Sequence, residues 1–354
     1  MTPRVERLRE ELARRSLAGL LVNHPANRRY LSGFTGSAGL LLILADKAYL
    51  CTDFRYLEQA AQEALGWEVV KLERPWTQTI AKLLGGVRGS VAYEAEHLTC
   101  AQYQDLASAL SEVELKAEKG LVEKLRVQKD EAELAVLRRA IALTDAGAAF
   151  LTSLLKPGLT EKEIALELEF FLRRRGAAGP SFPFIVASGP RSSLPHGEPT
   201  ERRLATGDFV TVDFGIVWDG YCSDLSRTFV LGEPTPQQRF LYDLVLNAQE
   251  TGIAAAGPGV PAAEVDAAAR AVISKAGYGD YFGHALGHGV GLEIHEEPHL
   301  TSSAAEALLP GTVVTVEPGV YLPGTGGVRI EDVVLITTTG REVLSQAPKQ
   351  LFVV

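Results

Sequence analysis

The chain has 354 residues, more than the roughly 250–300 at which a single hydrophobic core stops growing, so two domains are expected. Hydrophobic residues make up 46% of the sequence and charged residues 22%, which is typical of a globular protein and excludes a mainly disordered chain. The formal net charge is −9 and no block of basic residues occurs, so a nucleic acid is not an expected partner.

Cysteine usage and the N-terminal residues both indicate a cytoplasmic protein. Cys51, Cys100 and Cys222 are scattered without CxxC spacing, so neither a disulfide framework nor a cysteine zinc site is expected. The charged N-terminus is not followed directly by the apolar segment of a signal peptide. The longest apolar run, residues 39–45, is far shorter than the ~20 residues that span a bilayer, so we expect no membrane partner.

The order of predicted elements indicates two different domains. Helical and strand patterns alternate over the first ~120 residues, which is typical of an α/β domain. A charged segment at 116–129 precedes a predicted helix over 130–155, and a second helix begins at a capping box at Thr160. The chain becomes strand-rich from Pro183 onward, so we predict an α+β protein with domains at 1–122 and 123–354.

A hairpin at Asp219-Gly220 relates two aspartates. Asp-Gly between β-rich runs predicts a two-residue turn, which pairs Asp213 with Ser226 and places Asp224 opposite Gly215. Asp213 and Asp224 then share one face of the hairpin as diagonal neighbours, with Cα atoms about 7–8 Å apart. Two exposed aspartates would be the ordinary interpretation, but the strand around Asp213 is too apolar on both faces to be solvated.

A segment rich in glycine and histidine follows, from Gly283 to His299. Repeated glycines disfavour a helix and favour close approach of the backbone to a ligand, with His284, His288 and His295 turned inward. His295 to His299 also fits the H-E-x-x-H zinc-protease pattern by its letters. Pro298 and the missing helix argue against that motif, so His299 is interpreted as incidental.

Two further acids occur in apolar strands. Glu317 stands where a strand stops at a proline, and Glu331 shares a predicted strand, 328–337, with Arg329. A carboxylate there must be paired, metal-bound or exposed, and an Arg329–Glu331 ion pair is one alternative. Several carboxylates together with an imidazole suit Mn²⁺, Co²⁺ or Zn²⁺ in a two-metal hydrolase site, where a bridging water becomes a nucleophile.

In order and spacing, these residues resemble the metal ligands of the pita-bread metallopeptidases, a family that includes methionine aminopeptidase, aminopeptidase P and prolidase. The resemblance extends over nearly the whole chain. The segments 27–37 and 52–56 are similar to the N-terminal domain of the Xaa-Pro branch. It implies a C-terminal pita-bread (creatinase/aminopeptidase) catalytic fold behind an N-terminal α/β creatinase-like domain.

The resemblance implies a site for two divalent ions, with Mn²⁺ expected and Co²⁺ or Zn²⁺ as alternatives. The implied metal ligands are Asp213, Asp224, His288, Glu317 and Glu331.

It also implies roles on the substrate side. Glu317 would carry a proton from water to the leaving nitrogen. His284 and His295 match histidines that contact the substrate, and His196 matches a third. Arg329 would orient the carboxylates from behind.

From these patterns we expect hydrolysis of the Xaa-Pro bond at the N-terminus of dipeptides or short peptides, in a homodimer. Two alternatives remain open: a strict aminopeptidase P acting on longer peptides, and a non-catalytic peptide-binding protein on the same scaffold.

Overall fold

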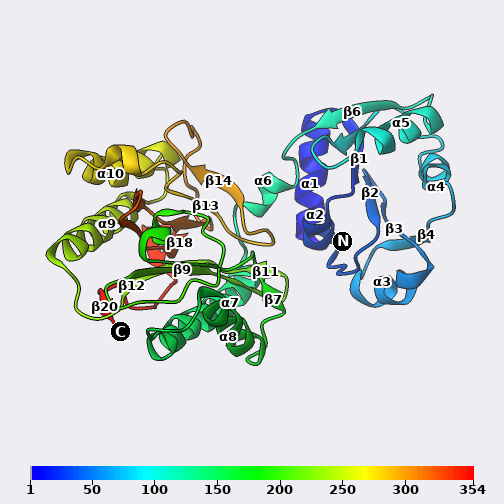
Figure 1. The fold of residues 1–354 in the computed structure, drawn as a ribbon. Helices are drawn as coiled ribbons and strands as arrows, with labels where there is room; N and C mark the ends of the chain where they lie inside the picture. The colour runs from blue at the N-terminus through cyan, green and yellow to red at the C-terminus, as the bar shows by residue number, and fades with distance from the viewer. Residues whose placement is uncertain (1) are drawn as a thin grey trace. The chain divides into compact units, whose positions relative to one another are not determined.

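The computed structural model describes residues 2–354, and the chain divides into two units. One unit ends at Arg126 and is blue to cyan in Figure 1, and the other spans Val127–Val354. The division falls four residues after the predicted boundary at residue 122. It does so because Glu123 and Arg126 both bond to Asn27 of the first unit, at 2.5 Å and 2.7 Å.

The first unit is built on a six-stranded mixed sheet of order β4-β3-β2-β1-β5-β6. Its helices and strands are α1 (Pro3–Arg14), β1 (Leu17–Val22), α2 (Pro25–Ser32), β2 (Leu40–Leu44), β3 (Ala48–Thr52), η1 (Phe54–Tyr56), α3 (Leu57–Glu63), β4 (Glu68–Lys71), α4 (Trp76–Leu83), β5 (Ser90–Glu94), α5 (Cys100–Ala109), β6 (Glu114–Glu118) and α6 (Glu123–Arg126). β2 and β3 are buried along their whole length, and alternate side chains of both strands form a core with α4 and α5. The α/β domain predicted from the alternation is confirmed.

The second unit begins with two helices that pack against a sheet. Its first half consists of α7 (Glu131–Leu154), α8 (Glu161–Arg173), β7 (Gly179–Pro180), β8 (Ile185–Ser188), η2 (Gly189–Ser193), β9 (Phe209–Phe214), β10 (Ile216–Trp218), β11 (Tyr221–Cys222) and β12 (Leu225–Val230). Capping boxes at Asp130 and Thr160 begin α7 and α8, because each N-cap side chain accepts from the backbone three residues later. α8 packs on β8, and α7 packs on β10 to β12.

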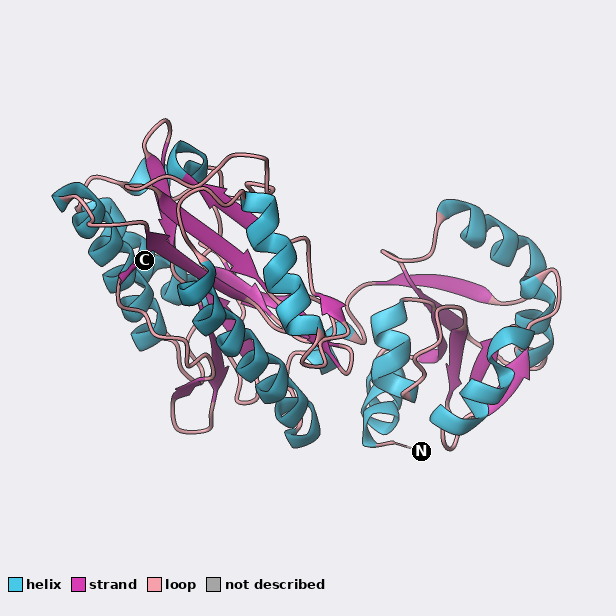
Figure 2. Cartoon of the chain, turned by 60° about the horizontal axis from the view of Figure 1, so that its bottom comes forward, coloured by secondary structure: helices cyan, strands magenta, loops and turns pink. Residues whose placement is uncertain are grey.

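The second half repeats this plan of a helix pair on strands. It consists of α9 (Pro236–Ala255), α10 (Ala262–Lys275), η3 (Gly279–Tyr281), β13 (Gly287–Gly289), β14 (Glu296–Leu300), β15 (Val313–Val316), β16 (Gly319–Leu322), β17 (Gly326–Arg329), β18 (Asp332–Ile336), β19 (Arg341–Val343) and β20 (Phe352–Val353). α9 packs on β15 to β17 and α10 on β14, and Figure 2 shows helices on the outside of the strands. Apolar side chains between helices and strands form the core of each half.

The register of the predicted hairpin is confirmed. Asp213 pairs with Ser226, and Trp218 pairs with Tyr221 across the turn. Asp219 and Gly220 both have positive φ, 43° and 76°, as a two-residue turn of type I′ requires. The turn therefore sets which side chains of β9 and β12 share a face.

The predicted continuous strand over 328–337 is wrong. The chain forms β17 up to Arg329 and β18 from Asp332, and the two strands belong to different sheets. Between them, the backbone N–H of Glu331 donates to the carbonyl of Ser226 at 3.2 Å. This break turns Glu331 out of either strand and toward the hairpin.

Two expectations from the sequence concern membrane-spanning segments and disulfides. Within residues 2–354 no helix has the length and apolar character needed to cross a bilayer. The cysteines of this range, Cys51, Cys100 and Cys222, are all free thiols.

The hairpin depends on a glycine opposite Asp224. A Cβ at Gly215 would overlap the carbonyl oxygen of Ser223 and the hydroxyl of Ser181. We expect Gly215→Ala to lower the free energy of unfolding by roughly 2–4 kcal/mol, measured by urea denaturation. Gly340→Ala is the matched control, because a Cβ there meets nothing within 4 Å. Equal stability of the two variants would contradict this account of the hairpin.

Candidate metal centre and substrate cavity

Three carboxylates meet where the hairpin faces the break between β17 and β18. Ligand oxygens of Asp213, Asp224 and Glu331 all lie within 4.8 Å of one another. The side chains are buried, with 9%, 6% and 1% of the residues' surface exposed. Asp213 and Asp224 reach this point because the hairpin register places them on one face.

His288 and Glu317 approach the same cluster from the second half of the unit. The Nε2 atom of His288 lies 3.3 Å from Glu317 Oε1 and 3.6 Å from Asp224 Oδ2. Thr315 holds both residues, since its hydroxyl accepts from the His288 backbone N–H at 3.0 Å and donates to Glu317 at 3.1 Å. The structure thus brings together all five residues that the sequence analysis proposed as metal ligands.

Glycines on either side of His288 allow its strand to fit between two neighbours. β13 pairs with both β14 and β15. A Cβ at Gly287 would overlap the carbonyl oxygen of Thr315, and a Cβ at Gly289 would overlap that of Glu297. The glycine-rich sequence therefore serves close packing of strands around His288, in addition to any approach to a ligand.

The His288 ring is oriented for metal binding. Its Nδ1 lies 3.0 Å from the Gly289 carbonyl oxygen, which can only accept a hydrogen bond. Nδ1 therefore carries a proton whether the ring is neutral or charged, and Nε2 is the nitrogen that can exchange its proton for a metal ion. A backbone carbonyl that fixes the tautomer in this way is common behind metal-binding histidines.

Arg329 supports the cluster through Asp213. Its Nη2 donates to Asp213 Oδ2 at 2.6 Å and its Nε donates to the Ser226 hydroxyl at 2.7 Å. Nη1 donates to the Tyr321 hydroxyl at 2.8 Å and to the Pro195 carbonyl at 3.1 Å. The ion pair of Arg329 is thus with Asp213, and the alternative of an Arg329–Glu331 pair is wrong.

The electrostatics of the cluster favour a bound cation. Burial, together with the neighbouring carboxylates, raises the pKa of Asp224 and of Glu331 well above the usual range. Burial also raises the pKa of Asp213, although Arg329 opposes this shift. At Glu317 burial acts in the same upward direction, but the hydrogen bond and charge of His288 outweigh it and lower the pKa to about 2.

Two oxygens of the cluster lack any hydrogen-bond partner within residues 2–354. These are Oδ1 of Asp213 and Oε1 of Glu331, and both are buried. Unsatisfied buried carboxylate oxygens are costly unless they are protonated or bound to a cation. Four carboxylates and one imidazole Nε2 form a donor set that fits two divalent ions of the Mn²⁺, Co²⁺ or Zn²⁺ type.

A cavity of about 670 Å³ opens over the cluster. Its wall combines apolar side chains with histidines. The apolar members are Phe182, Pro183, Ile185 and Ile294, and the histidines besides His288 are His196, His284, His295 and His299. The three substrate-side histidines expected from the resemblance therefore share one cavity. His299, which was interpreted as incidental, also lines it.

His284 is held in one tautomer by a tyrosine that the sequence analysis did not identify. Its Nδ1 donates to the Ala285 carbonyl at 2.8 Å, and its Nε2 lies 3.0 Å from the Tyr321 hydroxyl. Because Arg329 donates to that hydroxyl, Tyr321 donates onward to His284 Nε2. Burial lowers the pKa of His284, in agreement with a neutral ring. No motif in the sequence marks Tyr321, which lies in β16.

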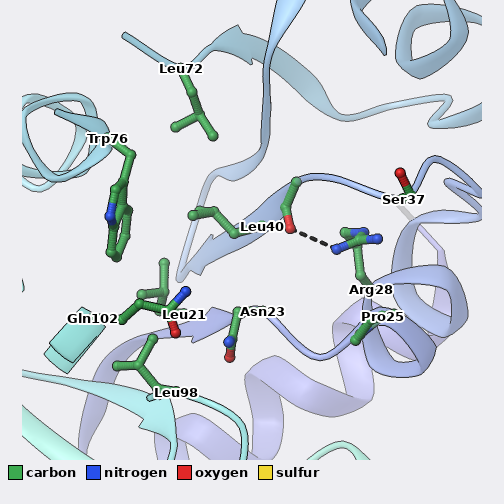
Figure 3. Close-up of a pocket in the computed structure, with 11 residues that line it drawn as sticks. Leu21, Asn23, Pro25, Arg28, Ser37, Leu40, Leu72, Trp76, Leu98 and Gln102 are labelled. Carbon is green, nitrogen blue, oxygen red and sulfur yellow. Dashed lines mark hydrogen bonds between the residues drawn. The ribbon is translucent and has the colours of Figure 1, made fainter. Parts of the chain in front are cut away.

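A second cavity, of about 270 Å³, lies within the first unit (Figure 3). Leu21, Leu40 and Trp76 line it, and Arg28 at its edge donates to the Gly39 carbonyl at 2.7 Å. No histidine, cysteine or carboxylate is among its lining residues, so it offers neither metal ligands nor a proton carrier.

The site and fold together are those of a metal-dependent hydrolase. Comparison with known families agrees: residues 135–338 match metallopeptidase family M24, and residues 4–128 match the creatinase/prolidase N-terminal domain. The chain belongs to metallopeptidase family M24, with a creatinase-like N-terminal domain and a C-terminal pita-bread domain.

Individual relatives are similar over their full lengths. The Xaa-Pro dipeptidase of Pyrococcus furiosus is 35% identical and covers 99% of this chain and 100% of its own. The structure of the Xaa-Pro dipeptidase from Bacillus anthracis matches with a TM-score of 0.97 at 43% identity and 99% coverage of both chains. The X-Pro aminopeptidase structure from Thermotoga maritima has a TM-score of 0.92 at 35% identity, with 99% and 100% coverage.

The raised pKa of Asp224 predicts that this residue destabilises the metal-free protein. Asp224 costs no free energy of folding below the unfolded pKa of about 4. Above it the cost grows with pH until the folded pKa is reached, and it is constant at higher pH. In EDTA at pH 8 we expect Asp224→Asn to increase the free energy of unfolding, because the amide carries no charge to bury.

The increase in the free energy of unfolding caused by Asp224→Asn should become smaller toward pH 5, where Asp224 of the wild type is increasingly protonated in the folded protein. Asp219→Asn, in the exposed turn of the same hairpin, is the matched control and should leave stability unchanged. Thermal unfolding in EDTA measures both. A loss of stability in metal-free Asp224→Asn would contradict the electrostatic account.

Proposed function

We propose that this chain is a dinuclear metal-dependent Xaa-Pro dipeptidase. The observation that carries the proposal is the meeting of Asp213, Asp224, His288, Glu317 and Glu331 at the floor of a histidine-lined cavity. Relatives named Xaa-Pro dipeptidase, similar over almost the whole chain, support the substrate class.

The five residues would hold two divalent ions. Their carboxylate oxygens and the Nε2 atom of His288 would together supply the ligands of both ions. Two such ions polarise the scissile carbonyl and lower the pKa of water, and Mn²⁺ is the metal we propose, with Co²⁺ or Zn²⁺ as substitutes. The unpartnered oxygens of Asp213 and Glu331 support the assignment.

The protein groups around the reacting bond handle protons and developing charge. Glu317 would accept a proton from the attacking water and deliver it to the leaving nitrogen. His196, His284 and His295 line the same cavity and would contact the peptide and its developing oxyanion. Arg329 fixes the position of Asp213.

The chemistry of an Xaa-Pro bond explains why such a site suits it. The bond nitrogen of proline carries no hydrogen, so a pocket that recognises extended peptides through their N–H groups loses a contact. Recognition by carbonyl polarisation and by apolar contact with the proline ring needs no such hydrogen. Phe182, Ile185 and Ile294 supply apolar surface in this cavity.

Recognition of the free carboxylate separates a dipeptidase from an aminopeptidase P. Arg329 is buried and already donates to Asp213, Ser226, Tyr321 and Pro195, so it is not available to a substrate carboxylate. His299 is exposed on β14 and lines the cavity, so we assign the carboxylate contact to it. The aminopeptidase from Thermotoga maritima keeps the longer-peptide alternative open to test.

Catalysis rather than mere peptide binding, a homodimer and a cytoplasmic location are three further parts of the proposal. A peptide-binding protein without catalysis is disfavoured, because the complete donor set would then have no use. The resemblance to the Xaa-Pro branch supports a homodimer. The composition and the scattered cysteines support a cytoplasmic location.

Loss of one metal ligand should remove catalysis. We expect Asp224→Asn to lower hydrolysis of an Xaa-Pro dipeptide by at least ~10³-fold and to reduce bound Mn²⁺, since the metal site loses one charged ligand. Stopped assays with Gly-Pro and elemental analysis of the same samples measure the two effects, with Asp219→Asn as control. Unchanged turnover in Asp224→Asn would refute the two-metal proposal.

Substrate length tests the carboxylate contact. With Mn²⁺, we expect kcat/KM for Gly-Pro to exceed that for an Xaa-Pro-Pro-Xaa peptide. His299→Ala should raise KM for Gly-Pro roughly tenfold, as expected for one lost charge-assisted hydrogen bond, and leave its kcat nearly unchanged. Faster cleavage of the longer peptide would instead establish an aminopeptidase P.

A further inference from the structure

We propose a separate zinc-type metal site in the first unit, formed by His24, His97 and Glu123. One possible ligand atom from each residue lies within 4.8 Å of the other two. The three residues are partly buried and belong entirely to the unit that ends at Arg126. The inference does not depend on the peptidase activity proposed above.

The three residues come from connections that are far apart in the sequence. His24 lies between β1 and α2, His97 lies between β5 and α5, and Glu123 is the first residue of α6. The parallel pairing of β1 with β5 brings the first two connections together at one end of the sheet. A shared ion would therefore join three segments that meet only in the folded domain.

Hydrogen bonds hold Glu123 and the backbone next to His24 in place. Glu94 accepts from the backbone N–H groups of Asn23 and His24, both at 2.7 Å. The Asn27 amide donates to Glu94 at 2.6 Å and to Glu123 at 2.5 Å. Such bonds to a carboxylate and to the backbone beside a histidine are the kind that orient metal ligands.

The charge of the surroundings also favours a cation. A small depression beside the cluster is lined by Glu94, Glu96, Glu118 and Glu123. Glu96 pairs with Lys119 at 3.2 Å and Glu118 pairs with Arg15 at 2.8 Å.

Within residues 2–354, the hydrogen bonds of Glu94 come from two backbone N–H groups and from the amide of Asn27, and this amide also donates to Glu123. Burial raises the pKa of Glu94. Glu123 supplies the carboxylate ligand of the proposed site, and Glu94 lines the same depression.

The donor set selects the class of metal. Two imidazole nitrogens and one carboxylate oxygen suit Zn²⁺, with water in a fourth position, and also Co²⁺ or Ni²⁺. His97 Nε2 already lies 3.5 Å from Glu123 Oε1. Ligand atoms around tetrahedral zinc lie roughly 3.3 Å apart, given bonds of about 2.0–2.1 Å, so this pair needs almost no movement.

The two imidazoles need a small rearrangement. Their rings are stacked with centroids 3.7 Å apart and an interplanar angle of 18°. Binding would open the stack so that one nitrogen of each ring points at the ion. The bound ion would then hold α6, the last helix of the unit, to the β1–α2 and β5–α5 connections.

The experiment measures zinc binding by the full-length protein. Wild type, His97→Ala, Glu123→Gln and the control Glu96→Gln are dialysed against Zn²⁺, and bound zinc is determined by elemental analysis. We expect His97→Ala and Glu123→Gln to bind about one zinc ion fewer per chain than wild type and Glu96→Gln. Each variant is also melted with and without Zn²⁺, and the two ligand variants should lose part of the zinc-dependent rise in Tm.

Repeating the comparison in the Asp224→Asn background separates this site from the catalytic cluster. The same difference of about one zinc ion should persist there, and Gly-Pro hydrolysis by His97→Ala with Mn²⁺ should equal that of wild type. Equal zinc content in wild type, His97→Ala and Glu123→Gln would overturn the inference whether or not the protein is a dipeptidase.

Discussion

Four carboxylates from Asp213, Asp224, Glu317 and Glu331 share one largely buried cluster, and the surrounding fold must accommodate their repulsion. Within the described chain, Arg329 donates to Asp213, and His288 lies against Glu317. Two carboxylate oxygens of the cluster still lack a hydrogen-bond partner among residues 2–354. Burying an unpaired charge costs more free energy than most single contacts contribute. The cluster is therefore stable only with protons or cations bound. The opposite pKa shifts of Glu317 and its neighbours follow from this competition.

The cluster also explains why the catalytic unit has two halves. The hairpin of the first helix–sheet half supplies Asp213 and Asp224. In the second half, β13 supplies His288, and the connections after β15 and β17 supply Glu317 and Glu331. Neither half holds enough donors for two ions alone. Glycines allow strands to approach closely around both ligand sets, at Gly215 in the first half and Gly287 in the second. Packing and ligand geometry are therefore set by the same backbone positions.

Local sequence patterns predict much of the site, but they do not predict contacts between segments that are distant in the sequence. Asp219-Gly220 defines a turn, and a turn fixes register, so the pairing of Asp213 was predictable. The apolar segment 328–337 also fits one strand, and only its pairing with two different partner strands explains the break. The contact of Arg329 with Tyr321 joins β17 to β16 side chains, and no period or motif in the sequence marks it.

The paired hairpin has a consequence for how this chain can vary. Residues 214–223 separate the two aspartates, and their number sets which face of the ladder each aspartate occupies. Insertion or deletion of one residue there would turn Asp224 to the opposite face, because side chains alternate along a strand. Most surface turns tolerate changes in length, but the length of this one fixes the relative position of two proposed metal ligands. Its length is therefore under the same constraint as the identity of the aspartates themselves.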